Sequence, residues 1–216
     1  KTDEALQLVR DFHHQLCETT VLDPACGSGN FLYVALEMMK RLEGEVTSLM
    51  IELGDTRPLI TVDPHQFLGI ELNPWAANVA ELVLWIGYLQ WHYRTYGTAA
   101  PSEPVLRDFK NIRNADAVLE WSDRTPRMDA DGNPVTRWDG VTTMRHPVTG
   151  EEVPDPAARV QVFDYAKPKP TQWPRAEFIV GNPPFIGAQY LRADLGDGYV
   201  EALWKAYPTM PHRADL

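Results

Sequence analysis

The pattern of apolar and polar positions predicts helices and strands in alternation along the chain. Residues 6–17 have the spacing of a helix, and the short run "TTVLD" at residues 19–23 predicts a strand. A long helix is expected over residues 31–51. Its apolar residues recur at helical intervals, at Phe31, Val34, Ala35, Met38, Leu42, Val46 and Leu49. A second strand, centred on residues 67–70, follows in "HQFLGIEL".

The next helix has a clear start signal, because Asn73 can cap its first turn and Pro74 suits the first helical position. The apolar stretch at residues 75–91 continues this helix and contains polar side chains, so it predicts a buried helix and not a membrane span. "DFKNIRNADAV" then predicts a weaker third strand, and residues 178–180 in "EFIV" predict a buried fourth strand. Strands that alternate with helices predict the α/β class, a parallel sheet with helices on both faces.

Residues 121–174 interrupt this alternation. Eight of the eighteen prolines lie in this segment, and "DADGNP" and "VTGEEV" are turn or hairpin signals. We therefore expect an excursion inserted between the third and fourth strands. A solvated surface hairpin is favoured over an arm that contacts substrate. Three tryptophans, Trp121, Trp138 and Trp173, indicate that part of the segment is packed.

Composition narrows the functional classes. The 216-residue chain has 30 acidic and 20 basic residues, and the net charge of −10 argues against its whole surface lying on a polyanion. Cys17 and Cys26 match neither a disulfide framework nor a zinc motif, which suits a reducing cytoplasm. The histidines show no metal-ligand spacing and are interpreted as surface or helix residues. They are His13, His14, His65, His92, His146 and His212.

The first strand ends in "DPACGSGNF", which begins at Asp23. Glycines two residues apart between a strand and a helix allow the backbone to come close to a ligand. The run is not a dinucleotide fingerprint, because Leu32 stands where the third glycine would be, and it lacks the Gly-Lys of a P-loop. An acidic residue before such a loop would repel a pyrophosphate but suits a ligand that carries a positive amino group.

Two acidic residues follow the next strands. Glu71, at the end of the second strand, is placed to accept hydrogen bonds from ribose hydroxyls. It lies about 40 residues after the glycine loop, and not the usual ~20, because the first helix and its connection are long. Asp116 has the matching place after the third strand and could bind a purine amino group. An ordinary helix cap at Asn114 or Asp116 is an equally good interpretation.

Four motifs resemble one family in their order along the chain. "DPACGSGNF", "GIELN", "NADAV" and "GNPPF" look like successive motifs of class I S-adenosyl-L-methionine-dependent amino methyltransferases that act on adenine N6 in DNA. More narrowly, "GNPPFIGAQYLRADLGDGYVEALWKAYP" and "WDGVTTMRHPVTGEEVPD" are similar to the methyltransferase region of MmeI-like restriction–modification proteins. Proteins of that family carry a nuclease, a methyltransferase and a DNA-recognition domain in one chain. The resemblance implies a Rossmann-like class I fold.

The resemblance also implies S-adenosyl-L-methionine as the cofactor and assigns residues to it. These cofactor-binding residues are Asp23, Ala25, Gly27, Gly29, Asn30, Phe31, Glu71 and Asp116. The catalytic residues implied are Asn182, Pro183, Pro184 and Phe185.

The "NPPF" run suits activation of an exocyclic amino group, a poor nucleophile because its lone pair is delocalised into the ring. The side-chain amide of Asn182 and, by resemblance, the carbonyl of Pro183 can accept its two hydrogens. Prolines hold that carbonyl rigidly and present no competing N–H donor. Phe185 offers a stacking face to a base that has left the duplex, worth about 1–3 kcal/mol.

Other activities are weighed on the same residues. Methylation of cytosine C5 needs a cysteine nucleophile near this motif, and Cys26 is better interpreted as a small buried residue of the cofactor loop. Amino methylation of cytosine N4, of adenine in RNA or of a protein glutamine remains open. So does a non-catalytic module that binds S-adenosyl-L-methionine or serves as a scaffold, although the intact run from Asn182 to Phe185 argues against it.

The family fold has seven strands, and the chain shows four of them. We therefore expect residues 1–216 to be part of a methyltransferase domain and to be inactive on their own. Methylation activity is then best measured on the full-length parent protein. DNA would be contacted mainly through parts beyond this chain, which would reconcile the negative charge with a DNA substrate. The remaining domains of the parent protein are the other expected partners, and a membrane is not expected to be one.

Overall fold

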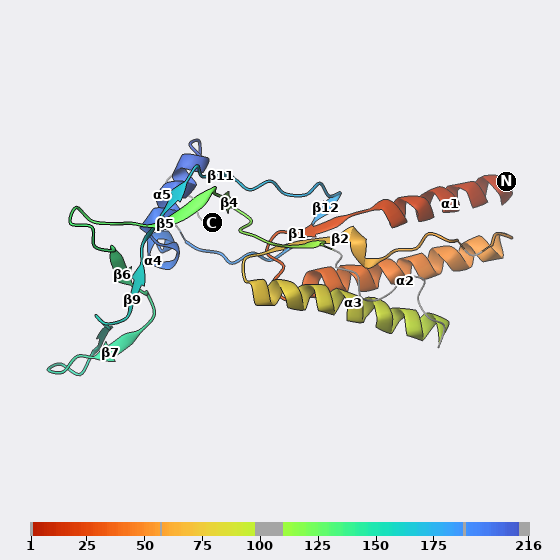
Figure 1. Cartoon of the computed structure of the whole chain (residues 1–216). Helices are drawn as coiled ribbons and strands as arrows, with labels where there is room; N and C mark the ends of the chain where they lie inside the picture. Colours follow the sequence, from red (N-terminus) through yellow and green to blue (C-terminus); the bar gives the residue numbers. More distant parts are fainter. Residues whose placement is uncertain (1, 57, 98–109, 188, 212–216) are drawn as a thin grey trace. The chain divides into compact units, whose positions relative to one another are not determined.

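The computed structural model describes residues 2–56, 58–97, 110–187 and 189–211 (Figure 1). His212 lies outside these residues. The chain divides into two compact units. The sheet unit comprises Lys1–Ala117 and Gln172–Pro183, and the hairpin unit comprises Val118–Thr171 and Pro184–Leu216.

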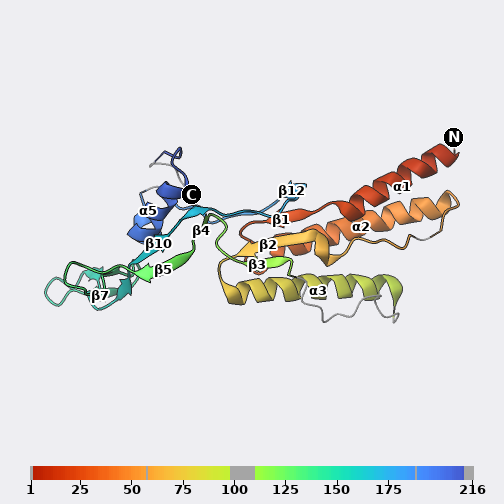
Figure 2. The same ribbon diagram turned by 45° about the horizontal axis from the view of Figure 1, so that its top comes forward.

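The sheet unit contains a four-stranded parallel sheet with flanking helices, as the sequence predicted. In spatial order the strands are β12 (Phe178–Ile179), β1 (Val21–Asp23), β2 (Phe67–Glu71) and β3 (Ile112–Asn114). The helices are α1 (Thr2–Glu18), α2 (Asn30–Glu52), α3 (Pro74–Tyr96) and the short η1 (Pro64–Gln66). Figures 1 and 2 show α2 and α3 lying side by side along the sheet.

The order of the strands defines where a ligand can bind. The chain moves in one direction from β1 through β2 to β3, and then returns to the opposite side of β1 as β12. The point where the strand order reverses therefore lies between β1 and β12. In open parallel sheets, ligands bind at such a point, outside the carboxyl ends of the strands.

Apolar packing between the sheet and its helices forms the core. The central cluster consists of Leu16, Val21, Cys26, Leu32, Leu36, Val62, Phe67, Ala80 and Leu84. Helix α3 begins as predicted, because the Asn73 side chain accepts hydrogen bonds from Trp75 N and Ala76 N and Pro74 follows directly. Within α3, a Cβ on Gly87 would lie 2.5 Å from the Tyr33 ring, so a glycine there allows α2 and α3 to pack closely.

The prediction that the fourth strand is buried is wrong. Phe178 and Ile179 pair with β1 as expected, yet they are 58% and 59% exposed, and Val180 is exposed as well. Their strand is at the edge of the sheet, since β1 is its one partner among the residues that the structure describes. An apolar run predicts a strand but cannot tell whether another layer covers it.

The long helix α2 forms where predicted, but most of its predicted apolar positions are exposed. Those that are exposed are Phe31, Val34, Met38, Leu42 and Leu49. The buried face is instead made by Leu32, Leu36, Lys40, Glu43, Val46 and Met50. The ammonium of Lys40 lies 2.8 Å from Glu43 Oε2, so two charged residues occupy buried positions that a hydrophobic pattern does not reveal.

The hairpin unit is built from nested antiparallel ladders. From the base outward, β4 (Leu119–Glu120) pairs with β11 (Lys169–Pro170), and β5 (Asp123–Pro126) pairs with β10 (Phe163–Ala166). Further out, β6 (Thr136–Trp138) pairs with β9 (Arg159–Gln161), and β7 (Thr143–Arg145) pairs with β8 (Glu152–Pro154). Residues 118–171 therefore form one long β-ribbon, and helices α4 (Leu191–Leu195) and α5 (Asp197–Ala206) complete the unit.

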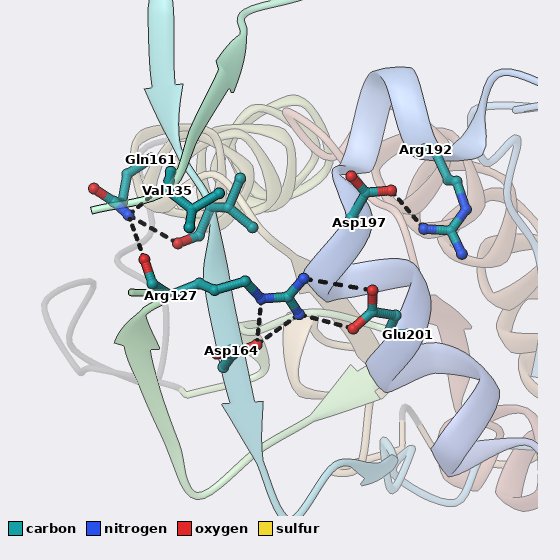
Figure 3. Close-up of polar contacts among 8 residues, drawn as sticks. Arg127, Val135, Gln161, Asp164, Arg192, Asp197 and Glu201 are labelled. Carbon is teal, nitrogen blue, oxygen red and sulfur yellow. Dashed lines mark hydrogen bonds and ion pairs between the residues drawn. The ribbon is translucent and has the colours of Figure 1, made fainter. Parts of the chain in front are cut away.

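Arg127 fastens the ribbon to helix α5. Its guanidinium donates to Asp164 on β10 at 2.6 Å and to Glu201 on α5 at 2.7 Å (Figure 3). Backbone packing supports this contact, since a Cβ on Gly198 would collide with the carbonyl oxygen of Phe163. Of the three tryptophans of the excursion, Trp121 and Trp138 are half-buried, whereas Trp173 is exposed. The Trp121 ring meets that of Tyr165 edge-on at 4.9 Å.

No helix among the described residues is both long enough and apolar enough to cross a membrane.

Candidate functional site

The glycine loop joins β1 to α2 at the reversal point of the sheet. Gly27 and Gly29 have φ angles of +54° and +85°, a left-handed conformation that glycine adopts without strain. A Cβ on Gly29 would also lie 3.1 Å from Cα of Ala80 on α3. Gly29 is therefore required both by its backbone conformation and by the close approach of α3.

Helix α2 starts directly after this loop. Its N-cap is Gly29, which has no side chain to cap the first N–H groups, so these donors are left for water or a ligand. Asn30 and Phe31, the first two residues of the helix, are both exposed, and Phe31 is 47% exposed. Both predicted cofactor residues thus lie open at the helix terminus.

Glu71 ties the glycine loop to the end of β2. Its Oε2 accepts a hydrogen bond from Gly27 N at 2.9 Å, and its Oε1 accepts one from Asn73 N at 2.7 Å. The structure therefore brings together two residues that the sequence placed in one site from motifs far apart. Because each carboxylate oxygen has a second lone pair, Glu71 keeps acceptor capacity for a ligand.

Asn114 has a structural role at this edge that the sequence did not predict. Its Nδ2 donates to the backbone carbonyls of Glu71 and Leu72, each at 2.9 Å, and so fixes the end of β2. The interpretation of Asn114 or Asp116 as a helix cap is wrong, because the element that follows β3 is a strand, β4, and not a helix. Asp116 is half-buried in the loop after β3, next to Ala115, whose N–H donates to the carbonyl of Glu71.

Asp23 is buried at the end of β1 with one oxygen unpaired. The residue is 1% exposed; its Oδ1 accepts from Ala25 N at 3.0 Å, and Oδ2 has no hydrogen-bond partner among the described residues. Burial raises the pKa of the Asp23 carboxyl and the negative charge of Glu71 adds to this, while the Ala25 N–H opposes it. A buried carboxylate oxygen without a partner is best satisfied by a positively charged donor.

The "NPPF" run begins at Asn182, three residues after the last residue of β12. Val180 N donates to the carbonyl of Leu22 at 2.9 Å, so the ladder with β1 continues to the residue before Gly181. Asn182 and Pro183 are exposed, lie outside helices and strands, and belong to the sheet unit. Pro184 and Phe185 belong to the hairpin unit, where the side chain of Phe185 is 83% exposed.

Cys26 is a packed core residue, as predicted. It is 6% exposed, and its Sγ would lie 2.8 Å from a Cβ on Gly69 of β2, so thiol and glycine fit together. Burial raises the pKa of the Cys26 thiol to about 12, with further contributions from Asp23 and Glu71. The thiol is therefore neutral at physiological pH, which is the opposite of what a nucleophile requires.

A buried charge cluster on the helices escaped the sequence analysis. His13 and Cys17 of α1 lie with Glu43 of α2 so that their ligand atoms are within 4.8 Å of one another. Metal ions bind such groups, but Lys40 already supplies a positive charge at Glu43 and lies 3.9 Å from the centre of the Trp91 ring. Glu43 Oε1 also accepts from Val62 N at 2.8 Å. We interpret the cluster as an internally balanced network that holds α1 against α2.

The one sequence signal for this buried charge cluster was the spacing of its residues along each helix. His13 and Cys17 are four residues apart on one helix, and Lys40 and Glu43 are three apart on the other, so each pair shares a helix face. Nothing in the sequence reports that the two faces meet.

Comparisons with known proteins identify the family of this chain. The family described as "MmeI, DNA-methyltransferase domain" matches residues 1–206. DNA methyltransferase A of Bacillus subtilis is 34% identical over 123 residues, which cover 52% of this chain and 14% of that protein. A protein of Methanocaldococcus jannaschii, named as a type II restriction enzyme and methyltransferase, is 28% identical over 125 residues, which cover 57% of this chain and 10% of that protein.

A solved structure of the type IIL restriction–modification enzyme MmeI in complex with DNA is also similar. The sequences are 31% identical, the TM-score is 0.46, and the match covers 51% of this chain and 16% of that chain. The matched region thus spans between a tenth and a sixth of each of these longer proteins.

Proposed function

Because the chain belongs to the family of MmeI DNA-methyltransferase domains, we propose that it carries the methyl-transfer site of a restriction–modification enzyme. The proposed reaction transfers a methyl group from S-adenosyl-L-methionine to the N6 amino group of a flipped adenine in DNA. The observation that supports it best is the buried, unpaired Oδ2 of Asp23, which lies at the reversal point of the sheet between the glycine loop and the start of the "NPPF" run.

The residues of the carboxyl edge fit this cofactor in charge and hydrogen-bonding capacity. Asp23 Oδ2 suits the ammonium of the methionine part, because that group is the charged donor which the oxygen lacks. Glu71 suits the two ribose hydroxyls, and Asp116 the adenine amino group. The remaining contacts are assigned to the loop and the start of α2, at Ala25, Gly27, Gly29, Asn30 and Phe31. When bound, S-adenosyl-L-methionine supplies an electrophilic methyl group.

Asn182 and Pro183 are assigned to activate the target. The amide oxygen of Asn182 and the carbonyl oxygen of Pro183 would each accept a hydrogen bond from one N–H of the amino group. These hydrogen bonds make the nitrogen lone pair more available for attack on the methyl group. These acceptors act most strongly as positive charge develops on the nitrogen, so their contribution falls mainly in the transition state. The neighbouring Pro184 restricts the backbone and adds no competing N–H donor.

Phe185 is assigned to hold the extruded base. A base must leave the duplex before its amino group can be reached, at a cost of a few kcal/mol, and stacking on an aromatic ring offsets about 1–3 kcal/mol of it. The exposure of Phe185 leaves its ring available for such a contact. Because the chain has a net charge of −10, most contacts to the DNA backbone are assigned to other parts of the longer protein.

A product analysis tests this function. The full-length parent protein would be incubated with DNA and S-adenosyl-L-methionine carrying a labelled methyl group, and the DNA then digested to nucleosides. We expect the label in N6-methyl-2′-deoxyadenosine. Label in N4-methyl-2′-deoxycytidine would replace adenine by cytosine as the target. A protein that binds the cofactor but labels no nucleoside would be a binding module.

A further inference from the structure

Gly181 is the point at which the end of β12 meets the Asp23 carboxylate. A Cβ built on Gly181 would lie 2.6 Å from Asp23 Oδ1 and 3.3 Å from Asp23 Cγ. Non-bonded carbon and oxygen atoms do not approach to 2.6 Å, so any side chain at position 181 would force one of the two residues to move.

The backbone conformation does not account for this glycine. Gly27 and Gly29 have positive φ angles that other residues adopt only with strain, whereas Gly181 lies outside the left-handed region. An alanine could therefore adopt the conformation of Gly181, and the contact with Asp23 is the steric reason for a glycine at this place.

Asp23 cannot easily move aside. It is 1% exposed, its Oδ1 is held by the N–H of Ala25, and burial leaves little space for another rotamer. Gly181 is also fixed, because the Val180 N–H donates to the carbonyl of Leu22, directly before Asp23. Both partners of the contact are thus anchored to β1.

We propose that Gly181 is a positioning residue that joins the cofactor half of the site to the catalytic half. Its missing side chain lets the backbone before Asn182 rest against the carboxylate assigned to the cofactor ammonium. A larger residue would displace the carboxylate, the Asn182 backbone, or both. The inference rests on the proposed function and adds to it a contact through which the two halves keep their relative positions.

The test is a double-mutant cycle in the full-length protein with Gly181→Ala, Asp23→Ala and the double variant. Two quantities are measured: the affinity for S-adenosylhomocysteine by calorimetry, and the single-turnover methyl-transfer rate at saturating cofactor. We expect Gly181→Ala to lower the rate by at least about tenfold, because displacement of a catalytic group by about 1 Å costs up to about 10²-fold. Gly44→Ala is the matched control, since a Cβ there meets no atom of the described residues within 4 Å.

The double variant separates the contact from a general loss of structure. Asp23→Ala removes the oxygen that the new Cβ would strike, so the double variant should transfer within about threefold of the Asp23→Ala rate and bind no more weakly than Asp23→Ala. The same holds for folding: if Gly181→Ala fails to fold and the double variant folds, the contact is supported.

Two results would overturn the inference. One is a Gly181→Ala protein with wild-type rate and affinity. The other is a double variant whose fold-loss in rate equals the product of the fold-losses of the two single variants, or one that also fails to fold. A wild-type protein that transfers no methyl group would instead contradict the proposed function, and the affinity half of the cycle would still report on the contact.

Discussion

The sheet unit is held together by apolar packing, whereas the hairpin unit depends more on backbone ladders and ion pairs. Nine buried residues from strands and helices form one cluster in the sheet unit. In the hairpin unit the buried apolar residues are Leu119, Val162, Leu191, Val200, Ala202 and Leu203, while the strand residues of β5 and β7 are exposed throughout. Arg127 and its two carboxylates connect the ribbon to α5 instead.

This difference separates the roles of the two units. A rigid apolar core can hold Glu71, Asp23 and the glycine loop in fixed positions, as a preorganised site requires. A ribbon fastened by partly exposed ion pairs depends on charge and therefore on salt concentration. We expect changes at the carboxyl edge of the sheet to alter chemistry, and changes in the ribbon to alter mainly stability.

The largest effect is expected for Asn182→Ala in the full-length protein. Loss of an acceptor that acts in the transition state should lower the single-turnover methyl-transfer rate by at least about 10²-fold. The affinity for S-adenosylhomocysteine should stay close to that of wild type, because Asn182 is assigned to the base. A near-normal methyl-transfer rate would mean that the "NPPF" run is only a structural turn and that Asn182 is not catalytic.

Glu71→Ala should act on binding. Removing the carboxylate assigned to the ribose hydroxyls should weaken cofactor affinity by about 1–3 kcal/mol. Part of this loss would come from the glycine loop, since the N–H of Gly27 would lose its acceptor. Calorimetry measures the affinity, and Glu81→Ala on α3 is a control. An affinity unchanged from wild type would remove Glu71 from the site.

Arg127→Gln should reduce stability without altering the chemistry. It leaves Asp164 and Glu201 without their shared cation, and the expected loss of unfolding free energy is about 1–2 kcal/mol, because the pair is partly exposed. Urea denaturation measures it, with Arg145→Gln on the exposed β7 as the control. A hairpin unit that contributed directly to cofactor binding would show a changed affinity in the Arg127 variant.

The smallest effect is expected for Cys26→Ala. The thiol has a pKa raised to about 12 and fills core space, so its loss should cost about 1 kcal/mol of stability and leave the rate within about threefold of wild type. The measurement is methyl transfer at neutral pH. A loss of methyl-transfer rate as large as that expected for Asn182→Ala would instead indicate that Cys26 acts as a nucleophile.

Local signals sufficed to predict the elements of the sheet unit. Asn73 and Pro74 start α3 because helix capping depends on adjacent residues. In the glycine loop, Gly27 and Gly29 adopt the left-handed backbone angles that glycine favours. Glu71 could be placed beside this loop because the carboxyl ends of parallel strands share one edge.

Features that depend on distant contacts could not be predicted. The buried Glu43 lies 3.8 Å from His13 of α1, and the pairing of α1 with α2 is not encoded in either helix alone. The exposure of Phe178 depends on which layer lies beside β12, and not on its own sequence. Likewise, Asp164 and Glu201 meet Arg127 from segments 37 and 74 residues away.

Hydrogen–deuterium exchange of the full-length protein, with and without saturating S-adenosylhomocysteine, tests most directly whether the carboxyl edge of the sheet unit is the cofactor site. We predict slower exchange at the amides of residues 25–31 and 71–73, and little change across residues 119–170 of the ribbon. Protection confined to the ribbon, or no protection at the glycine loop in the presence of bound ligand, would contradict the assignment of the cofactor to this edge of the sheet.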